Sequence, residues 1–177
     1  MNHPLRSLDP RLLGSLTIRL GGLLVFATAL IMFLDVPLRG ESSPWGIVSF
    51  ELAGTPHRAL QILLEWKSRG AIGYAKLIQI ADFVYLIIYA MFFAALALWI
   101  GSRLDETLWS TRAAWAATYA AAFDVLENGV LLYEVARFTS PAPFPQLAAS
   151  FAAVKFALLI FSASYAVIGG VALLRQR

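Results

Sequence analysis

Four acidic or amide side chains and one lysine interrupt the long apolar stretches of this sequence. Asp82 lies in one stretch, Asp124, Glu127 and Asn128 lie together in the next, and Lys155 lies in a third. Ionisable side chains within a hydrocarbon-length helix are costly and are kept where they face protein or a water-filled cavity. Three carboxylates beside a single lysine further require either that an acid is protonated or that a cation is bound. These five residues are therefore the candidates for a functional site.

Helix geometry predicts that these side chains converge. At 100° per residue, Asp124 and Asn128 share one face of their helix. Counted from the helix ends on one membrane side, Asp82, Glu127 and Lys155 all lie roughly 12–15 Å below the surface. The spacing therefore predicts one intramembrane polar cluster, with two tyrosines in its wall. Its expected members are Asp82, Asp124, Glu127, Asn128, Lys155, Tyr85 and Tyr89.

The composition indicates an integral membrane protein. Of the 177 residues, 59% are hydrophobic and only 14% are charged, whereas about 25% are charged in a typical soluble domain. The chain has no cysteine, and its two histidines, His3 and His57, lie outside the apolar stretches. Thiol chemistry, cysteine-ligated metals and a haem between two intramembrane histidines are thereby excluded, and no metal site is predicted. The net charge of +3, placed at the ends of the stretches, fits membrane lipid headgroups better than nucleic acid.

The apolar stretches predict an all-α membrane protein with a single transmembrane domain over residues 1–177. Its expected architecture is an antiparallel four-helix transmembrane bundle, with spans at about residues 16–36, 72–100, 109–136 and 147–174. In the first loop, Thr55 is a typical N-cap and Pro56 suits a first helical position. They predict one amphipathic helix at about 56–69, which is too short to span and lies in the membrane interface. It is either a surface connector or a lid.

Charge placement predicts the orientation of the spans. With both termini in the cytoplasm, slightly more lysine and arginine residues lie on the cytoplasmic side, as the positive-inside rule requires. Nearer the opposite surface, Lys76 and Glu134 lie at similar depth and could form an ion pair.

Several segments together resemble an uncharacterised bacterial family of four-span integral membrane proteins. The resemblance is carried by Gly-Ile-Val-Ser-Phe-Glu-Leu-Ala at 46–53, by Ala59, Ile62, Leu63 and Trp66, by Asp82, and by Asp124-x-x-Glu127-Asn128. It covers most of the chain and implies a bacterial inner-membrane protein, but no activity. It also makes Glu51 and Trp66 candidates for the same site, with interfacial packing as the alternative.

The leading functional hypothesis is a polar intramembrane pocket that binds a small hydrophobic molecule, a lipid or a cation. Asp82, Asp124 and Glu127 would face the ligand, and as a carboxylate trio they could also hold Mg²⁺ or Ca²⁺. Asn128 would donate and accept hydrogen bonds, and Lys155 would be the internal counter-charge.

Two alternatives remain open at this stage. The chain could be a structural or assembly subunit of a larger membrane complex or oligomer, in which the buried charges specify helix packing. It could also be a small proton- or cation-coupled transporter or a lipid-modifying enzyme. The sequence identifies no catalytic residue, no cofactor and no partner beyond membrane lipids.

Overall fold

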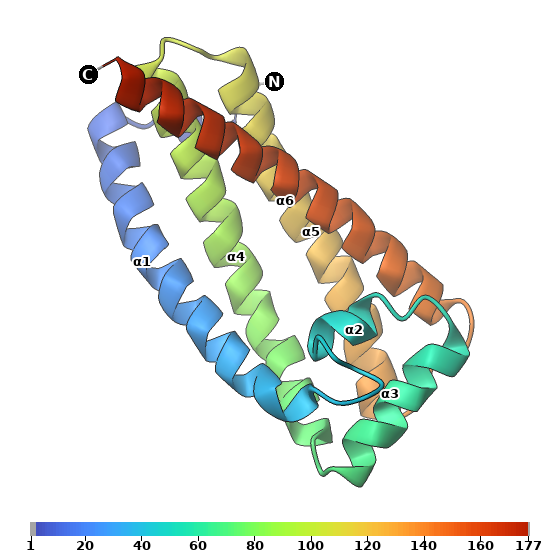
Figure 1. The fold of residues 1–177 in the computed structure, drawn as a ribbon. Coiled ribbons are helices and arrows are strands. Elements are labelled where there is room, and N and C mark those ends of the chain that lie inside the picture. The colour runs from blue at the N-terminus through green and yellow to red at the C-terminus, as the bar shows by residue number, and fades with distance from the viewer. Residues whose placement is uncertain (1–2, 177) are drawn as a thin grey trace. The chain divides into compact units, whose positions relative to one another are not determined.

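The computed structural model describes residues 3–176, and the prediction of an all-α chain is confirmed (Figure 1). No strand occurs among these residues. The long helices are α1 (Pro10–Asp35), α4 (Ile72–Arg103), α5 (Leu108–Arg137) and α6 (Phe144–Arg175). The short elements are the 3₁₀ turns η1 (Pro4–Ser7) and η2 (Val36–Leu38) and the helices α2 (Ile47–Glu51) and α3 (Pro56–Ser68).

Three helical segments are long and apolar enough to cross a membrane, whereas the sequence analysis predicted four. They are Pro10–Leu38, Ile72–Arg103 and Phe144–Arg175. Helix α5 has 30 residues, within the range of the other three long helices, but it is not among these segments, because Asp124, Glu127 and Asn128 lower the mean apolar character of its middle. The predicted count of four spans thus differs from the count that length and composition support.

The helix ends follow local capping signals. Helix α1 begins at Pro10, six residues before the predicted start, and the Asp9 carboxylate accepts a hydrogen bond from the Arg11 N–H at 2.7 Å. The helix predicted at 56–69 is confirmed as α3. As expected, the Thr55 hydroxyl accepts a hydrogen bond from the Arg58 N–H at 3.2 Å and Pro56 occupies the first turn.

The chain divides into two compact units, and each long helix contributes to both. The first unit comprises Met1–Phe26, Ile87–Ala122 and Lys155–Arg177. The second unit comprises Ala27–Leu86 and Phe123–Val154. Each unit has its own hydrophobic core.

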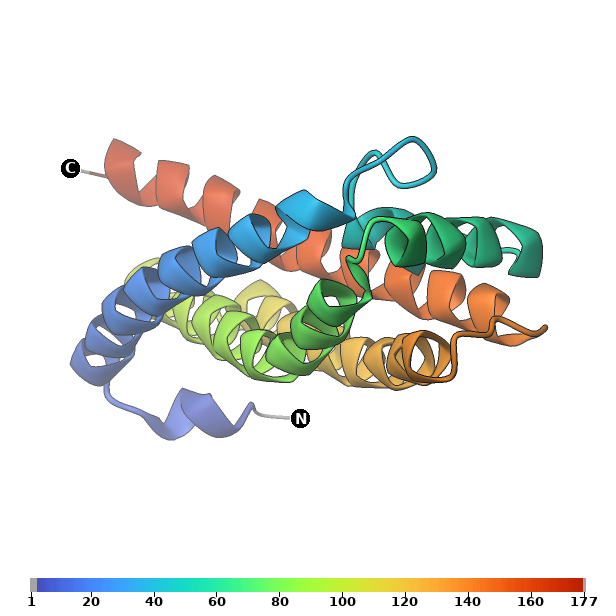
Figure 2. The same cartoon turned by 90° about the horizontal axis from the view of Figure 1, so that it is seen from below.

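Alanines dominate the core of the first unit. Helices α4 and α5 meet there through buried alanines, which let two helix backbones approach closely. In the same unit, η1 doubles back from the start of α1 (Figure 2). It is attached to α5 by a 3.1 Å hydrogen bond between His3 and Thr118 and by a 2.6 Å hydrogen bond from Arg6 to the Thr111 hydroxyl. The core alanines are Ala94, Ala95, Ala97, Ala113 and Ala114.

Large side chains fill the core of the second unit, and Trp66 of α3 is the largest of them. Its side chain is fully buried, and its ring centroid lies 5.2 Å from that of Phe50. The indole N–H donates to the Leu38 carbonyl at 2.8 Å and to the Ser43 hydroxyl at 3.0 Å. Trp66 therefore has the packing role that the sequence analysis held as the alternative to a site residue.

Hydrogen bonds to two carboxylates hold the connection between α1 and α4 in place. Asp35, at the end of α1, accepts the Ile47 N–H at 2.7 Å and pairs with Arg39 at 3.1 Å. Gly46 has a φ of +59°, and a Cβ there would lie 2.1 Å from an Asp35 oxygen, so only glycine fits. The connection is therefore a fixed part of the second unit.

The second of these carboxylates is that of Glu65 on α3. It accepts the backbone N–H groups of Glu41 at 2.9 Å and Ser42 at 2.7 Å. Burial raises the pKa of Glu65, but these hydrogen bonds and the charge of Arg69 outweigh it, so the pKa is lowered. Glu65 is thus held in its charged form, in which it accepts both N–H groups.

Candidate functional site

Asp82, Asp124 and Asn128 form a hydrogen-bonded group in the second unit. The Asn128 amide donates to the Asp82 carboxylate at 2.6 Å and, more weakly, to the Asp124 carboxylate at 3.5 Å. Asp124 and Asn128 lie one turn apart on α5 and so share a face, while Asp82 comes from α4. Asp124 and Asn128 are buried, and Asp82 is half-buried. One amide therefore bridges two carboxylates from two helices.

Three further polar residues of the second unit lie on the same two helices. Glu127 precedes Asn128 on α5 and is fully buried. Tyr85 follows Asp82 on α4, and its hydroxyl lies 3.1 Å from that of Thr28. Gln79, one turn before Asp82, is buried, and its side-chain oxygen accepts no hydrogen bond from any described residue. Gln79 was not predicted as a site residue, although its i, i+3 spacing to Asp82 was the available signal.

The interior of the second unit is rich in acids. Among the described residues it buries five carboxylates but no lysine or arginine. Buried carboxylates are stabilised by ion pairs, by hydrogen bonds or by protonation; Asp35 pairs with Arg39, and Glu134 accepts a hydrogen bond from Ser140. The buried acids are Asp35, Glu51, Asp124, Glu127 and Glu134.

One of these acids contradicts a sequence expectation. Glu134 accepts a hydrogen bond from the Ser140 hydroxyl, just beyond the end of α5. Lys76, its expected partner, is exposed and makes no ion pair with any described residue. The predicted Lys76–Glu134 pair is therefore wrong, because a nearby hydroxyl on the turn after α5 meets the carboxylate instead.

The carboxylates do not form a metal centre in the part of the chain that the structure describes. No three His, Asp or Glu side chains there come together closely enough to hold a metal ion. The suggestion that Asp82, Asp124 and Glu127 jointly hold Mg²⁺ or Ca²⁺ is thus not supported.

The two remaining predicted residues, Lys155 and Tyr89, belong to the first unit. Both are buried, and the Lys155 ammonium lies 4.8 Å from the centroid of the Phe156 ring. The expectation that they join the acids in one cluster stays a prediction.

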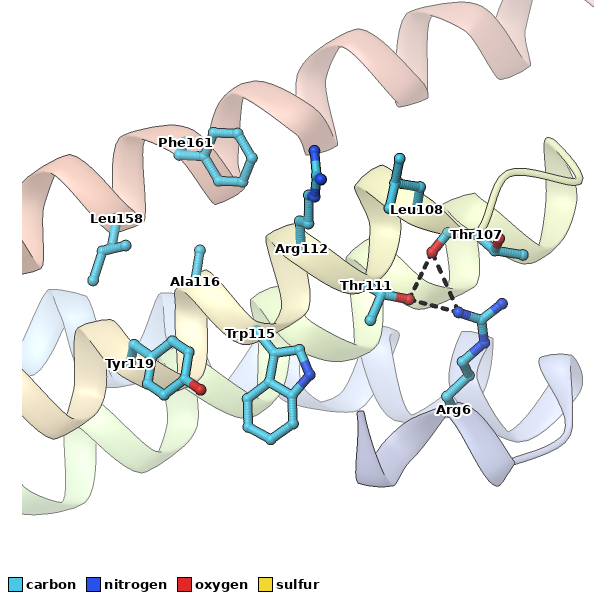
Figure 3. Close-up of a pocket in the computed structure, with 10 residues that line it drawn as sticks. All are labelled: Arg6, Thr107, Leu108, Thr111, Arg112, Trp115, Ala116, Tyr119, Leu158 and Phe161. Carbon is cyan, nitrogen blue, oxygen red and sulfur yellow. Dashed lines mark hydrogen bonds between the residues drawn. The ribbon is translucent and has the colours of Figure 1, made fainter. Parts of the chain in front are cut away.

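The first unit contains an open groove of about 690 Å³ that the sequence analysis did not predict (Figure 3). Arg6 comes from η1, Arg112 and the aromatic residues Trp115 and Tyr119 come from α5, and Leu158 and Phe161 come from α6. Periodicity along one helix could not reveal a surface assembled from segments so far apart in the chain. The combination of arginines with nearby tryptophan and tyrosine was the only local signal.

Comparison of the chain with protein-family models, with curated proteins and with solved structures finds no match in any of the three.

Proposed function

We propose that this chain is an integral protein of the bacterial inner membrane, built as a four-helix transmembrane bundle with both termini in the cytoplasm. In this proposal α5 is the fourth span. Its 30 residues reach about 45 Å at 1.5 Å per residue, more than the roughly 30 Å of hydrocarbon. Its polar residues Asp124, Glu127 and Asn128 are buried, as intramembrane polar residues must be.

Within this bundle, the group of Asp82, Asp124 and Asn128 binds a small amphiphilic molecule that carries a positive charge or hydrogen-bond donors. The observation that supports this is the Asn128 amide, which bridges one buried and one half-buried carboxylate from two helices. Ionised carboxylates only accept hydrogen bonds, so the complementary ligand group is a donor or a cation. Tyr85 supplies an aromatic wall beside Asp82.

The same hydrogen bonds also support an alternative in which the protein has a structural role and binds no ligand. The hydrogen bond from Asn128 to Asp82 joins α4 to α5, and interhelical polar contacts in membranes stabilise packing by about 0.6–2 kcal/mol. On this alternative the acids hold the helices together, and the chain is a structural subunit of a larger membrane complex.

Native mass spectrometry of the detergent-purified protein distinguishes the two. The probes are a long-chain alkylamine and the neutral alcohol of the same chain length. We expect wild type to retain the amine in preference to the alcohol, and Asp82→Asn or Asp124→Asn to weaken amine binding about tenfold, which corresponds to 1.4 kcal/mol. Glu134→Gln is the matched control, because it neutralises a buried carboxylate of the same unit outside the group.

The opposite pattern would favour the structural alternative. In that case wild type and all variants bind the amine equally, while Asp82→Asn and Asp124→Asn lower the unfolding temperature more than Glu134→Gln does.

A further inference from the structure

Arg6 is held in place at the groove of the first unit while most of its donors remain available. One guanidinium nitrogen, Nη1, donates to the Thr111 hydroxyl at 2.6 Å and to the Thr107 carbonyl at 3.3 Å (Figure 3). A guanidinium has five N–H groups, and the three on Nε and Nη2 donate to no described residue. The Arg6 guanidinium is therefore a cation in a fixed position whose remaining N–H donors are available to a ligand in the groove.

Arg112 brings a second positive charge to the same groove. Its guanidinium carbon lies 4.9 Å from the centroid of the Trp109 ring, a cation–π contact that orients the group but leaves its charge in place. Arg112 makes neither a hydrogen bond nor an ion pair with any described residue. Two guanidinium groups therefore line one groove without a carboxylate partner from the described chain.

The acids nearest to these arginines in the sequence are Asp9, Asp105 and Glu106, and the Asp9 carboxylate accepts the Arg11 N–H at 2.7 Å. The Glu106 carboxylate caps α5 by accepting the N–H groups of Trp109 at 2.6 Å and Ser110 at 2.9 Å, and it also accepts the Tyr165 hydroxyl at 3.1 Å. Asp105 is exposed and forms no ion pair with a described residue. Arg6 also borders a second pocket that Asp105 and Glu106 line, but neither Arg6 nor Arg112 forms an ion pair with a described acid, so both charges are available to a bound anion.

The rest of the groove is apolar and aromatic. The Trp115 and Tyr119 rings stack at 5.5 Å with an interplanar angle of 22°, and Leu158 and Phe161 of α6 line the groove with them (Figure 3). Tyr119 lies seven residues beyond Arg112 on α5, about 10 Å along the helix axis. A volume of about 690 Å³ is far more than a single phosphate occupies, and it lies in the usual range of organic-ligand sites.

We propose that this groove binds an anionic phospholipid, with its phosphate at Arg112, with Arg6 as a second positive charge lining the same groove, and with an acyl chain along Trp115, Tyr119, Leu158 and Phe161. Arginine suits phosphate because its planar donors match the phosphate oxygens. Tryptophan and tyrosine concentrate at the level of lipid headgroups. The site goes beyond the proposed function, since every residue of the groove belongs to the first unit and none belongs to the acidic group.

Delipidated protein in detergent, titrated with phosphatidylglycerol or with phosphatidylcholine of the same acyl chains, tests the proposal by native mass spectrometry. We expect wild type to retain phosphatidylglycerol at least tenfold more strongly than phosphatidylcholine. Arg112→Gln should lower that preference about tenfold. Arg112 is the better position to vary, because Arg6 also anchors η1 and its loss could disturb the fold.

Arg103→Gln is the matched control. Arg103 is also exposed and also lies over a tryptophan ring, that of Trp99 at 5.8 Å, but it does not line the groove. Arg103→Gln should keep the phosphatidylglycerol preference within about twofold of wild type. Arg112→Lys should retain a large part of this preference.

Three results would overturn the proposal. One is equal retention of the two lipids by wild type, which is the behaviour of a nonspecific lipid shell. Another is an equal loss of the preference in Arg103→Gln and Arg112→Gln. The last is full displacement of phosphatidylglycerol by soluble glycerol phosphate at equal concentration, which would make the ligand a free phosphate. None of these measurements involves Asp82 or Asp124, so the phospholipid site can be refuted without refuting the ligand site proposed at Asp82 and Asp124.

Discussion

The two units of this chain use opposite chemistry. The second unit buries five carboxylates and surrounds a fully buried tryptophan with large apolar side chains, whereas the first unit packs α4 against α5 through alanines and lines a groove with two arginines. Each of the four long helices contributes residues to both units. The same helix can therefore supply close backbone packing at one end and a buried polar group at the other, according to which residues occupy its inward face.

This difference means that the units should respond to different kinds of substitution. A core of large side chains is weakened when volume is removed, because a cavity remains. A core of alanines and glycines is weakened when volume is added, because two backbones are pushed apart. The three predictions that follow test this contrast, from the largest expected effect to the smallest.

Removing Trp66 should be the most damaging change in the second unit. Trp66→Ala leaves a large cavity and removes the donor to the Leu38 carbonyl, so we expect a loss of about 3–5 kcal/mol in the free energy of unfolding. Chemical unfolding in detergent measures it. Trp45→Ala, in the same connection but at a side chain that is 68% exposed, should stay within about 0.5 kcal/mol of wild type. Equal losses would show that the second unit does not depend on its tryptophan core.

Adding one methyl group should damage the first unit at Gly101. A Cβ there would lie 2.4 Å from the Ser110 Cβ and 2.5 Å from the Glu106 carbonyl oxygen, so Gly101→Ala should cost about 1–3 kcal/mol in the same unfolding measurement. The control is Gly129→Ala in α5 of the second unit, where nothing lies within 4 Å of the added Cβ. There alanine should stabilise the helix by about 0.5–1 kcal/mol. A stabilising Gly101→Ala would contradict the close packing described for the first unit.

Low pH should remove the stabilisation that Glu65 gives to the α1–α4 connection. This is the smallest effect of the three predictions. Because the pKa of Glu65 is lowered from 4.5 in the folded protein, its stabilisation is complete above about pH 4.5. It is lost as the pH falls below 4.5 through the folded pKa, since only the unfolded state then takes up the proton. Wild type should therefore exceed Glu65→Gln in stability by less than about 1 kcal/mol at pH 6.

The unfolding temperatures of the two proteins, followed from pH 6 to pH 3, should converge as Glu65 is protonated. Glu41→Gln, which changes an exposed neighbouring carboxylate, should show no such convergence. A Glu65→Gln difference that persists unchanged to pH 3 would mean that the charge of Glu65 is not what holds the connection.

Local sequence signals correctly predicted the features that are defined within a single helix, such as its start and its buried face. Thr55 and Pro56 defined the start of α3, and helical periodicity placed Asp124 and Asn128 on one buried face. The hydrogen bond between Asn128 and Asp82 agrees with the predicted polar cluster. The predicted count of four spans differs from the three segments that length and composition support, because the polar residues of α5 lower its apolar character.

Features that join distant segments could not be predicted in this way. The groove depends on Arg6 meeting Thr111 across 105 residues, and no periodicity relates the two. Glu134 takes its hydrogen bond from Ser140 around the end of α5, where helical spacing no longer applies. In both cases the deciding contact involves an irregular segment whose path only the folded structure defines.

The fastening of the α1–α4 connection also bears on the order in which the chain can fold during synthesis. Asp35 reaches Ile47 over 12 residues, Glu65 reaches Ser42 over 23 and Trp66 reaches Leu38 over 28. Contacts this local close small loops and form early. The connection can therefore assemble once Trp66 has left the ribosome, before α4 has emerged from it. The N-terminal turn, whose partners lie 105 and 115 residues away, must wait until α5 has been synthesised.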